Sequence, residues 1–437
     1  MRSYHDLPAK GRPISVVEPV NQIELSSELL SQLAGLAVDV REGLLALSVR
    51  VGLKVMEAML EEEIATIVGP KGRHSPARTA YRHGHEDGTV VLGGRKVTVA
   101  KPRVRSKAGQ EVVLQAFERF QAEDALHQTA MDRMLHGIST RRYHKGLEDI
   151  GSGIDVQGIS KSSISRNFMQ RTHQALTELL ERRFDSTHFV ALFIDGFALG
   201  DHLVITAMGL DAEGQKHILS IREGATENAQ VCKDLLRELV ERGFDASRGL
   251  LAVLDGSKAL RAAVVATFGD KVLIQRCQVH KLRNVLDYLP DSRKAEVKHK
   301  MRQAWAETDA DQAKRKLEML ADSLKYDHPD AAGSLREGLE ETLTVAKLAL
   351  PGTLKKTLRS TNPMESAFDG TATHTRNVKR WRNGDQVLRW MAAALLEVEK
   401  RFRRIKGYKE IPVLIDVLAK STAGLSTPPE FKKEAIA

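Results

Sequence analysis

The chain has 437 residues, with 66 Lys and Arg against 57 Asp and Glu and a formal net charge of +9. A hydrophobic fraction of 42% excludes a wholly disordered protein. At about 100–200 residues per domain, the length predicts two to four domains. No run of 18 apolar residues is present to cross a membrane, and the first residues lack the apolar stretch of a signal peptide. Two cysteines cannot build a disulfide framework, so we expect a soluble, intracellular protein.

The N-terminal part changes from a helical pattern to a basic, strand-like pattern at about residue 69. Residues 1–68 are predicted to form an N-terminal helical segment, because residues 23–68 have apolar residues at helical spacing, and this segment is a candidate dimerisation surface. Residues 69–113 predict a β-hairpin, because apolar and polar residues alternate around the Gly93–Gly94 pair. Between residues 70 and 107, ten Lys or Arg stand against two acidic residues. A basic ribbon fits a DNA groove, and the alternative is a solvated surface hairpin.

Residues 114–185 are helical in pattern and resemble a helix-turn-helix DNA reader. A short predicted helix and a glycine-containing turn precede Ser160–Arg166, which opens an amphipathic helix with small polar and basic residues. The alternative is a plain helix that Ser160 or Ser162 caps.

Residues 186–285 predict an α/β sheet of the ribonuclease H-like class. The predicted strands cover residues 188–196, a hairpin over 201–224, 249–256 and 271–280, and the predicted helices cover 228–244 and 257–269. This order places antiparallel strands first and parallel crossovers afterwards. The fold class is therefore multidomain α/β, with an α-rich N-terminal part and a mixed catalytic sheet.

The C-terminal half continues with helical patterns of contrasting charge. Residues 286–350 are predicted to be all-helical and carry 11 basic against 13 acidic residues, which indicates an insertion into the sheet domain. Residues 351–408 then complete the core, and between residues 371 and 406 ten Lys or Arg stand against three acidic residues. We expect residues 409–437 to form a loosely ordered tail.

Two aspartates end matching hydrophobic strands of the predicted sheet. Asp195 ends the first strand and Asp255 ends the fourth, and each precedes a glycine. Because these strands are neighbours in the predicted fold, the two carboxylates should lie together and require compensation by divalent cations. The alternatives are a helix cap for Asp255 and a turn residue for Asp195.

A third carboxylate is expected from a helix that returns to the sheet edge. The best candidate is Glu365, although Asn362 as N-cap and Pro363 at the first helical position would also make it a capping-box glutamate. Glu397 and Glu399 are weaker candidates because they lie among aliphatic and basic residues of one helix.

The sequence Cys277-Gln-Val-His280 ends the last predicted strand. Cys-x-x-His is half of a zinc site, but no second pair follows at zinc-finger spacing, so we expect a position beside the carboxylates or simple packing. Trp305 in the predicted helical insertion has two possible roles, packing in the core and stacking on a nucleic-acid base.

Five ordered motifs resemble those of the Mutator-type transposases of bacterial insertion sequences, a branch of the DDE (Asp, Asp, Glu) recombinases. They span roughly residues 30–408 together with the N-terminal hairpin. The motifs are Phe193-Ile-Asp-Gly, Arg222-Glu-Gly-Ala-Thr-Glu-Asn228, Leu254-Asp-Gly-Ser-Lys-Ala-Leu-Arg261, Gln275-Arg-Cys-Gln-Val-His-Lys-Leu-Arg-Asn-Val285 and Thr361-Asn-Pro-Met-Glu-Ser366.

The resemblance implies a ribonuclease H-like DNA transposase in which Asp195, Asp255 and Glu365 bind two Mg²⁺ ions, with Mn²⁺ as a substitute. It places Cys277, His280 and Asn362 near this active site. It further implies binding to terminal inverted repeats, phosphodiester hydrolysis, 3′-OH strand transfer, at least a dimer on DNA, and a cytoplasmic, nucleoid-associated location. The alternatives are a related nuclease without strand transfer and a domesticated DNA-binding protein.

The residues expected to contact DNA are small polar or basic and belong to the basic hairpin, the helix-turn-helix region, the motif helices or the second basic segment. They are Arg82, Arg95, Lys96, Lys101, Arg103, Arg105, Lys161, Ser163, Arg166, Lys258, Lys281, Arg283, Arg376, Lys379, Arg380 and Arg382.

Overall fold

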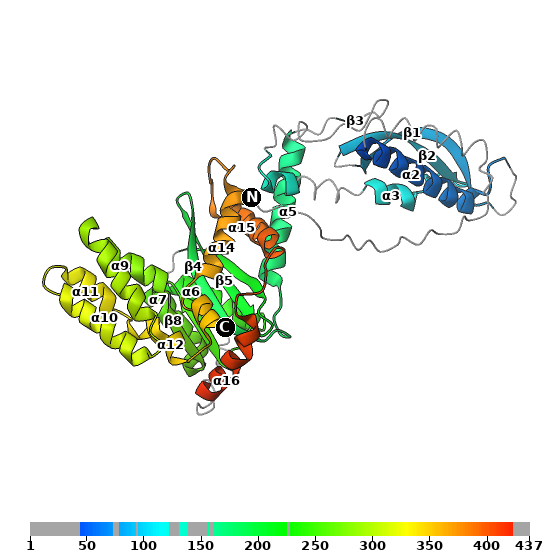
Figure 1. The fold of residues 1–437 in the computed structure, drawn as a ribbon. Coiled ribbons are helices and arrows are strands. Elements are labelled where there is room, and N and C mark those ends of the chain that lie inside the picture. Colours follow the sequence, from blue (N-terminus) through cyan, green and yellow to red (C-terminus); the bar gives the residue numbers. More distant parts are fainter. Residues whose placement is uncertain are drawn as a thin grey trace, which may run out of the picture. The chain divides into compact units, whose positions relative to one another are not determined.

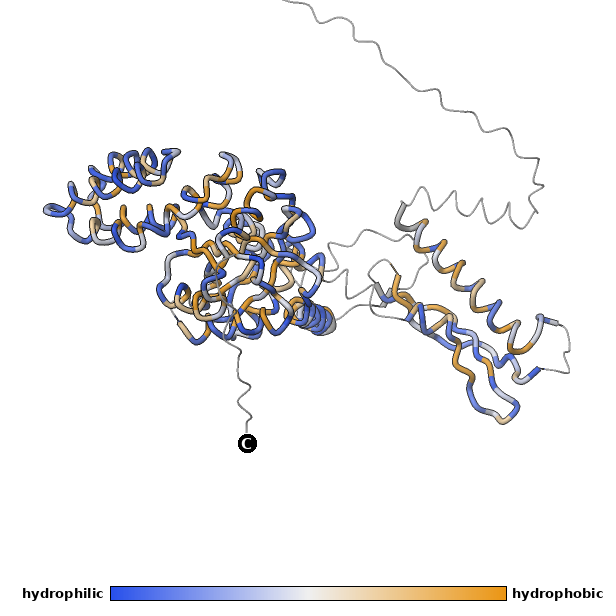
Figure 2. Tube along the Cα trace, turned by 90° about the horizontal axis from the view of Figure 1, so that it is seen from below, coloured by the Kyte–Doolittle hydropathy of each residue, from blue (hydrophilic) through white to orange (hydrophobic). Residues whose placement is uncertain are grey.

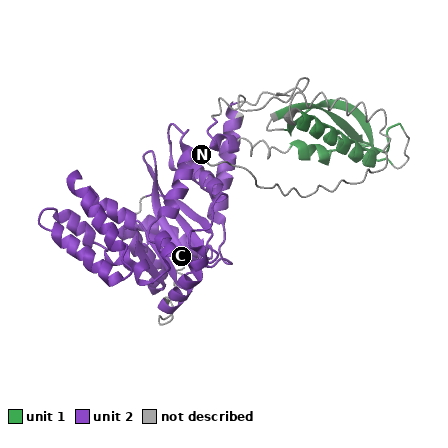
Figure 3. Ribbon diagram, viewed as in Figure 1, with its two compact units in different colours: residues 1–122, 147–158 green, residues 123–146, 159–437 purple. Residues whose placement is uncertain are grey.

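The computed structural model describes residues 44–72, 78–92, 95–121, 131–138, 156–157, 161–224 and 228–422. The chain divides into two compact units, residues 1–122 with 147–158 and residues 123–146 with 159–437 (Figure 3). No described helix combines the length and apolar character needed to span a membrane.

The N-terminal unit is built on a long antiparallel hairpin. Its elements are α2 (Leu44–Val68), β1 (Ala80–Leu92), β2 (Arg95–Ser106), α3 (Gln115–Gln121) and β3 (Val156–Gln157). Leu92 pairs with Arg95, so the predicted two-residue connection is present, although Gly93 and Gly94 lie outside the described residues. The hairpin is longer than the sequence pattern predicted, because the pairing continues past a bulge after Arg82.

A single apolar stripe holds α2 on the hairpin. Met56, Leu60 and Ile64 recur at helical spacing and are buried against Val90 and Val97 of the strands. Figure 2 shows hydrophobic residues recurring along the helix of this unit, next to the hairpin. Residues 1–43 lie outside the description, so the predicted dimerisation segment is seen only as α2.

The prediction that residues 114–185 are helical is wrong at Val156–Gln157. Val156 and Gln157 form the edge strand β3, which pairs with Val97 and Lys96 of the hairpin. The helix that opens at residue 161 is present as α5 (Lys161–Glu181). The predicted turn and much of the preceding segment lie outside the described residues.

The second unit contains the predicted mixed sheet (Figure 1). Its strands are β4 (Phe189–Leu199), β5 (His202–Asp211), β6 (Lys216–Glu223), β7 (Leu250–Leu254) and β8 (Val272–Arg276). The order is β6-β5-β4-β7-β8, with antiparallel pairing from β6 to β4 and parallel pairing from β4 to β8. The first and fourth strands of the prediction, β4 and β7, are therefore neighbours.

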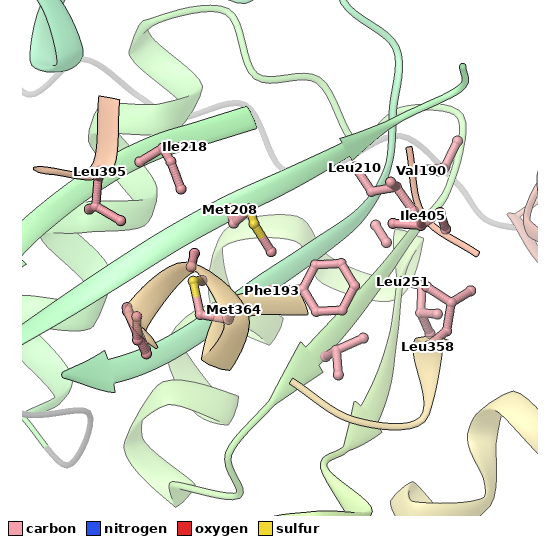
Figure 4. Packing of buried hydrophobic residues seen from close by; sticks show 14 of the residues in the cluster. Val190, Phe193, Met208, Leu210, Ile218, Leu251, Leu358, Met364, Leu395 and Ile405 are labelled. Carbon is pink, nitrogen blue, oxygen red and sulfur yellow. The ribbon is translucent and has the colours of Figure 1, made fainter. Parts of the chain in front are cut away.

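Helices cover both faces of this sheet. One face carries α6 (Ala229–Glu241) and α7 (Lys258–Phe268), and the other carries α5 with α13 (Gly352–Leu358), α14 (Asn362–Thr375), α15 (Gly384–Glu399) and α16 (Ile411–Thr422). In Figure 4, Phe193, Met208 and Leu251 of the strands meet Leu358 and Met364 of the helices in one buried cluster. This packing fixes the first turn of α14 against the sheet.

The segment between β8 and α13 is helical and has its own core. It contains α8 (Gln278–Asp287), α9 (Asp291–Trp305), α10 (Ala310–Leu324), α11 (Pro329–Arg336) and α12 (Thr344–Lys347). Trp305 is buried there and its indole N–H donates to the Thr342 hydroxyl at 3.3 Å, so the packing reading of this residue is confirmed.

The expectation of a loosely ordered C-terminal tail is wrong for residues 411–422. These residues form α16, whose Ile411, Leu414 and Leu418 are almost fully buried in the core beside the sheet. The apolar spacing of three and four residues between them is that of a helix with one buried face. Residues 423–437 lie outside the description.

Candidate active site

The two aspartates lie next to each other on neighbouring strands. Ile194 of β4 is opposite Leu254 of β7 in the parallel register, so Asp195 and Asp255 are the next residues on each side. Asp195 is not at a strand end as predicted, because β4 continues to Leu199 and pairs with β5. Only β7 stops at Leu254, and Asp255 leaves the sheet there.

Asp195 is a buried carboxyl in an environment that disfavours its charge. The residue is 6% exposed, and burial raises the pKa of its carboxyl. The charge of Asp255 acts in the same direction. Opposing contributions come from the charge of His280 and from hydrogen bonds of the Thr361 hydroxyl and the Gly196 N–H. The site therefore favours an added positive charge.

Asp255 begins a tight turn rather than capping the next helix. Its Oδ1 accepts from the Ser257 N–H at 2.9 Å, while the Ser257 hydroxyl is the side chain that caps α7. Gly256 has a φ of +114°, and its carbonyl accepts from the Arg276 guanidinium at 2.8 Å. A Cβ on Gly256 would overlap that guanidinium. The backbone at this position thus requires the glycine that follows Asp255.

Cys277 and His280 lie beside the aspartates, although not at the end of a strand as predicted. Cys277 is the N-cap of α8, and its Sγ accepts from the His280 N–H at 3.5 Å. It also accepts from the Thr361 N–H at 3.4 Å. The Thr361 hydroxyl contacts both Cys277 Sγ and His280 Nδ1 at 3.5 Å. The motif therefore joins α8 to the start of α14.

The thiol and the imidazole shift each other's titration. Burial opposes ionisation of Cys277, but the hydrogen bond and charge of His280 lower the pKa of this thiol. Contact with Cys277 raises the pKa of His280 to about 9, against the effect of burial, and the charges of Asp195 and Asp255 add to the rise. A protonated imidazole at neutral pH thus lies close to both aspartates.

Glu365 lies in the first turn of α14 and is turned toward an arginine. The N-cap is Thr361 rather than Asn362, so Glu365 is the fourth helical residue and not at the capping-box position. Its Oε1 lies 3.2 Å from Nη1 of Arg283 on α8, and its side chain is 32% exposed. Within the described residues, no three His, Cys, Asp or Glu side chains converge closely enough to hold a metal ion.

The two rival glutamates are engaged elsewhere. Glu399 accepts from Arg182 at 3.0 Å and from the Ile218 N–H at 2.7 Å, which ties α15 to β6 and to the residue that follows α5. Glu397 pairs with Lys400 at 2.8 Å.

The structure brings together Asp195, Asp255, Cys277 and His280. Thr361 joins them, although it was not among the predicted site residues. Its position directly before Asn-Pro is the sequence signal that could have identified it as the N-cap of α14.

Comparison with known proteins identifies the family. Residues 21–404 match the model described as "Transposase, Mutator family". The chain belongs to this transposase family. It is 28% identical to the transposase for insertion sequence element ISRM5 of Rhizobium meliloti, over 81% of this chain and 88% of the relative. It is also 26% identical to the transposase for IS1081 of Mycobacterium tuberculosis, over 94% and 96%. Family membership makes the protein a DNA-processing enzyme.

The basic residues of this transposase's hairpin are partly neutralised by carboxylates. Arg82 forms a bidentate pair with Glu61 at 2.6 and 2.8 Å, and Arg103 forms one with Glu111 at the same distances. Lys101 binds Glu86 at 2.8 Å. Arg105 and Lys96 are half-buried, and the side chain of Arg95 lies outside the description.

In the second unit, most of the predicted DNA contacts are exposed. Lys161 and Arg166 are exposed on α5, while the side chain of Ser163 lies outside the description. Lys258 is 83% exposed and lies 3.2 Å from Glu337. The loop between α14 and α15, with the adjoining end of α14, presents four exposed cations that form no ion pair with a described residue: Arg376, Lys379, Arg380 and Arg382. Asn362 is exposed at the start of α14.

Lys281 is not at the surface, which corrects its predicted role in DNA contact. It is 1% exposed, and its ammonium donates to the carbonyls of Ser334 at 2.5 Å and Glu337 at 2.7 Å. It therefore ties α8 to the end of α11. Burial lowers the pKa of Lys281 to about 8, with the charge of Arg276 acting in the same direction.

Replacement of Lys281 by methionine should change the pH dependence of stability. The native pKa near 8 lies below that of an unfolded lysine, so the unfolded state binds more protons between pH 8 and 10. The unfolding free energy of the wild type should therefore rise relative to Lys281→Met by up to about 1.4 kcal/mol per pH unit in that window. Urea unfolding at four pH values measures this, with the exposed Lys325→Met as control. Parallel curves would contradict it.

Proposed function

We propose that this transposase cleaves DNA at the ends of its insertion sequence and joins the freed 3′-OH to target DNA, with Asp195, Asp255 and Glu365 as its DDE carboxylates. The observation that carries the proposal is the adjacent register of Asp195 and Asp255 at the point where β7 ends. The strand order supports a ribonuclease H-like core, and the helices between β8 and α13 would be an insertion into it.

The donor set fits Mg²⁺. Carboxylate oxygens are the ligands that this hard cation prefers, and the raised pKa of Asp195 reflects a buried charge without full compensation. Asp195 and Asp255 would hold the ions, and Glu365 would complete the set after leaving Arg283. Bound there, two Mg²⁺ ions, or Mn²⁺ as a substitute, supply activation of the attacking oxygen and stabilisation of the leaving oxygen.

The remaining residues of the site position these carboxylates. Thr361, the N-cap of α14, contacts Cys277, and this contact would position Glu365 in the first turn of the helix. The protonated His280 reduces repulsion between the aspartates before cations bind. Arg283 of α8 holds Glu365 of the first turn of α14 as an ion pair. Each of these contacts orients a carboxylate that would otherwise repel its neighbours.

The exposed cations of the second unit support contact with DNA phosphates. Four lie at 376–382, and Lys161 and Arg166 open the helix that resembles a DNA reader. Recognition of terminal inverted repeats would use these residues together with the hairpin. Two ends must be processed in one reaction, so we include at least a dimer on DNA in the proposal.

A joining assay tests the function. The protein is incubated with labelled element ends, a supercoiled plasmid and Mg²⁺, with EDTA as the control. Labelled ends covalently joined to plasmid are the expected product. Cleaved ends without joined product would instead indicate a nuclease of the same fold. Specific binding of the ends without cleavage in Mg²⁺ or Mn²⁺ would indicate a DNA-binding descendant.

A further inference from the structure

A basic groove lies beside the first turn of α14, and no Asp or Glu is among the described residues that line it. Its volume is about 730 Å³. It is formed where the start of β6, the end of α13, the start of α14 and the segment after α15 meet. Six cationic side chains line the groove: Lys216, Lys356, Arg359, Arg403, Arg404 and Lys406. None of the six forms an ion pair with a described residue.

The cations of this basic groove are held together without compensation. Lys216 is half-buried, and its ammonium lies 4.5 Å from the centre of the Phe402 ring. Burial lowers the pKa of Lys216 and also that of Arg359, for which the charge of Arg302 acts in the same direction. Grouping six like charges raises the energy of the free protein, and a bound polyanion would relieve it.

The neutral lining of the basic groove also suits phosphate oxygens. Thr353, Thr357, Ser366 and Asn362 line the same space as the cations. Protein contacts to nucleic-acid phosphates come from these residue types together with Arg and Lys. Six cations exceed the charge of a single phosphate, so an extended chain of phosphodiesters matches the lining better than a small anion does.

The position of the basic groove relates it to the proposed carboxylates. Pro363 and Ser366 line it, and Glu365 lies between them in the same turn of α14. Gln278, next to the Cys277 cap, donates its N–H to the carbonyl of Arg359. A strand lying in the groove would therefore pass the helix turn that carries the third carboxylate.

We propose that the basic groove binds the phosphodiester backbone of the DNA strand that is being cut or joined. This inference deepens the proposed function and rests on it for the identity of the strand. The charged lining offers cations rather than a base-reading pattern, so binding in the groove should be independent of sequence. End-containing and unrelated duplexes should then lose affinity equally when the groove is altered.

The test uses full-length protein and a charge-matched pair of variants. Lys356→Glu with Arg403→Glu reverses two exposed groove cations, and Arg315→Glu with Lys325→Glu reverses two exposed cations of α10 and its C-cap. Fluorescence anisotropy measures binding to a labelled element-end duplex and to an unrelated duplex over a range of KCl concentrations. The slope of the logarithm of the binding constant against the logarithm of the salt concentration reports the number of phosphates neutralised, at about 0.9 per phosphate contact.

The groove variant should bind both duplexes at least tenfold more weakly at low salt, and its log–log slope should be smaller by about two. The α10 variant should stay within about twofold of wild type. Equal losses for the two variants, or an unchanged slope for the groove variant, would overturn the inference. Thermal unfolding checks the fold, and removal of like charges should leave the midpoint unchanged or raise it. If the groove variant unfolds, the measurement is repeated with the uncharged double variant Arg403→Gln with Lys406→Gln, for which a tenfold loss of affinity is again expected.

Failure of the groove inference and failure of the proposed function give different results. If wild type joins DNA and the groove variant binds and joins equally well, only the groove inference is wrong. If wild type never joins DNA but its binding still depends on Lys356 and Arg403, the groove inference holds and the transposition chemistry is wrong.

Discussion

Replacement of Asp195 by alanine should reduce Mg²⁺-dependent joining by about 10³-fold or more while leaving the binding of element ends intact. The residue supplies one of two adjacent carboxylates, and loss of metal-ion catalysis removes several kcal/mol of transition-state stabilisation, at about 1.4 kcal/mol for each factor of ten. Joining assays and anisotropy on the same preparation measure both properties. Retained joining in Asp195→Ala would refute the assignment of this carboxylate.

The stability of asparagine variants provides a second readout that does not depend on catalysis. Asp195 and Asp211 are each 6% exposed in the same sheet, but the pKa of Asp195 is raised by burial. The pKa of Asp211 is lowered despite burial, because His217 and backbone N–H groups bind its carboxylate. Without metal at neutral pH, Asp195→Asn should therefore raise the unfolding free energy and Asp211→Asn should lower it.

The pH dependence of the unfolding free energy should also differ between Asp195 and Asp211. Because the native pKa of Asp195 is above its unfolded value, this residue destabilises the fold above that pKa, and the penalty disappears as the pH falls to the unfolded value. Asp211 contributes stability above its unfolded pKa and loses it as the pH falls through the lower native value. Urea unfolding from pH 4 to 7 compares the variants, and equal shifts in both would contradict the burial argument.

Replacement of Gly256 by alanine should destabilise the protein by about 1–3 kcal/mol and strongly reduce joining. Gly256 has a φ of +114°, which side chains rarely adopt, and its added Cβ would overlap the guanidinium of Arg276. The guanidinium is 8% exposed and also donates to the Glu337 carbonyl at 3.0 Å, so it has little freedom to move. Relief of the overlap would shift the Asp255 turn, and a small displacement of a catalytic group costs about 10²-fold.

Gly333→Ala is the matched control for this substitution. Gly333 lies inside α11, its φ is not positive, and no atom lies within 4 Å of an added Cβ. Alanine there should stabilise the protein by about 0.5–1 kcal/mol and leave joining unchanged. Chemical unfolding and the joining assay measure both variants. Equal stability and activity for Gly256→Ala and Gly333→Ala would show that the backbone at Asp255 tolerates a side chain.

The adjacency of Asp195 and Asp255 could be predicted from the sequence because it depends on strand order. Two buried apolar runs each end in Asp-Gly, and the preference for short crossovers places the fourth strand next to the first. The residues around the two aspartates could not be placed in this way. Thr361 reaches Cys277 over a sequence separation of 84 residues, and no local pattern specifies such a contact.

The predicted DNA contacts were less accurate because charge along a chain does not show how it is paired in space. Lys281 follows His280 in an exposed-looking motif, yet its ammonium is buried by carbonyls more than 50 residues away. Arg82 and Arg103 are neutralised by Glu61 on α2 and by Glu111 after the hairpin. The groove cations come from three separate segments, at Lys216, at 356–359 and at 403–406, and only the last belongs to a basic run that is visible in the sequence.

The distribution of tryptophan and cysteine side chains makes one of the two units observable by itself. The chain has three tryptophans and two cysteines, and all five lie in the unit that contains the α/β sheet: Trp305, Trp381, Trp390, Cys232 and Cys277. Intrinsic tryptophan fluorescence therefore follows the unfolding of that unit alone and is silent on the N-terminal hairpin unit. Both thiols are fully buried, so their reaction with a thiol reagent measures the opening rate of the same unit.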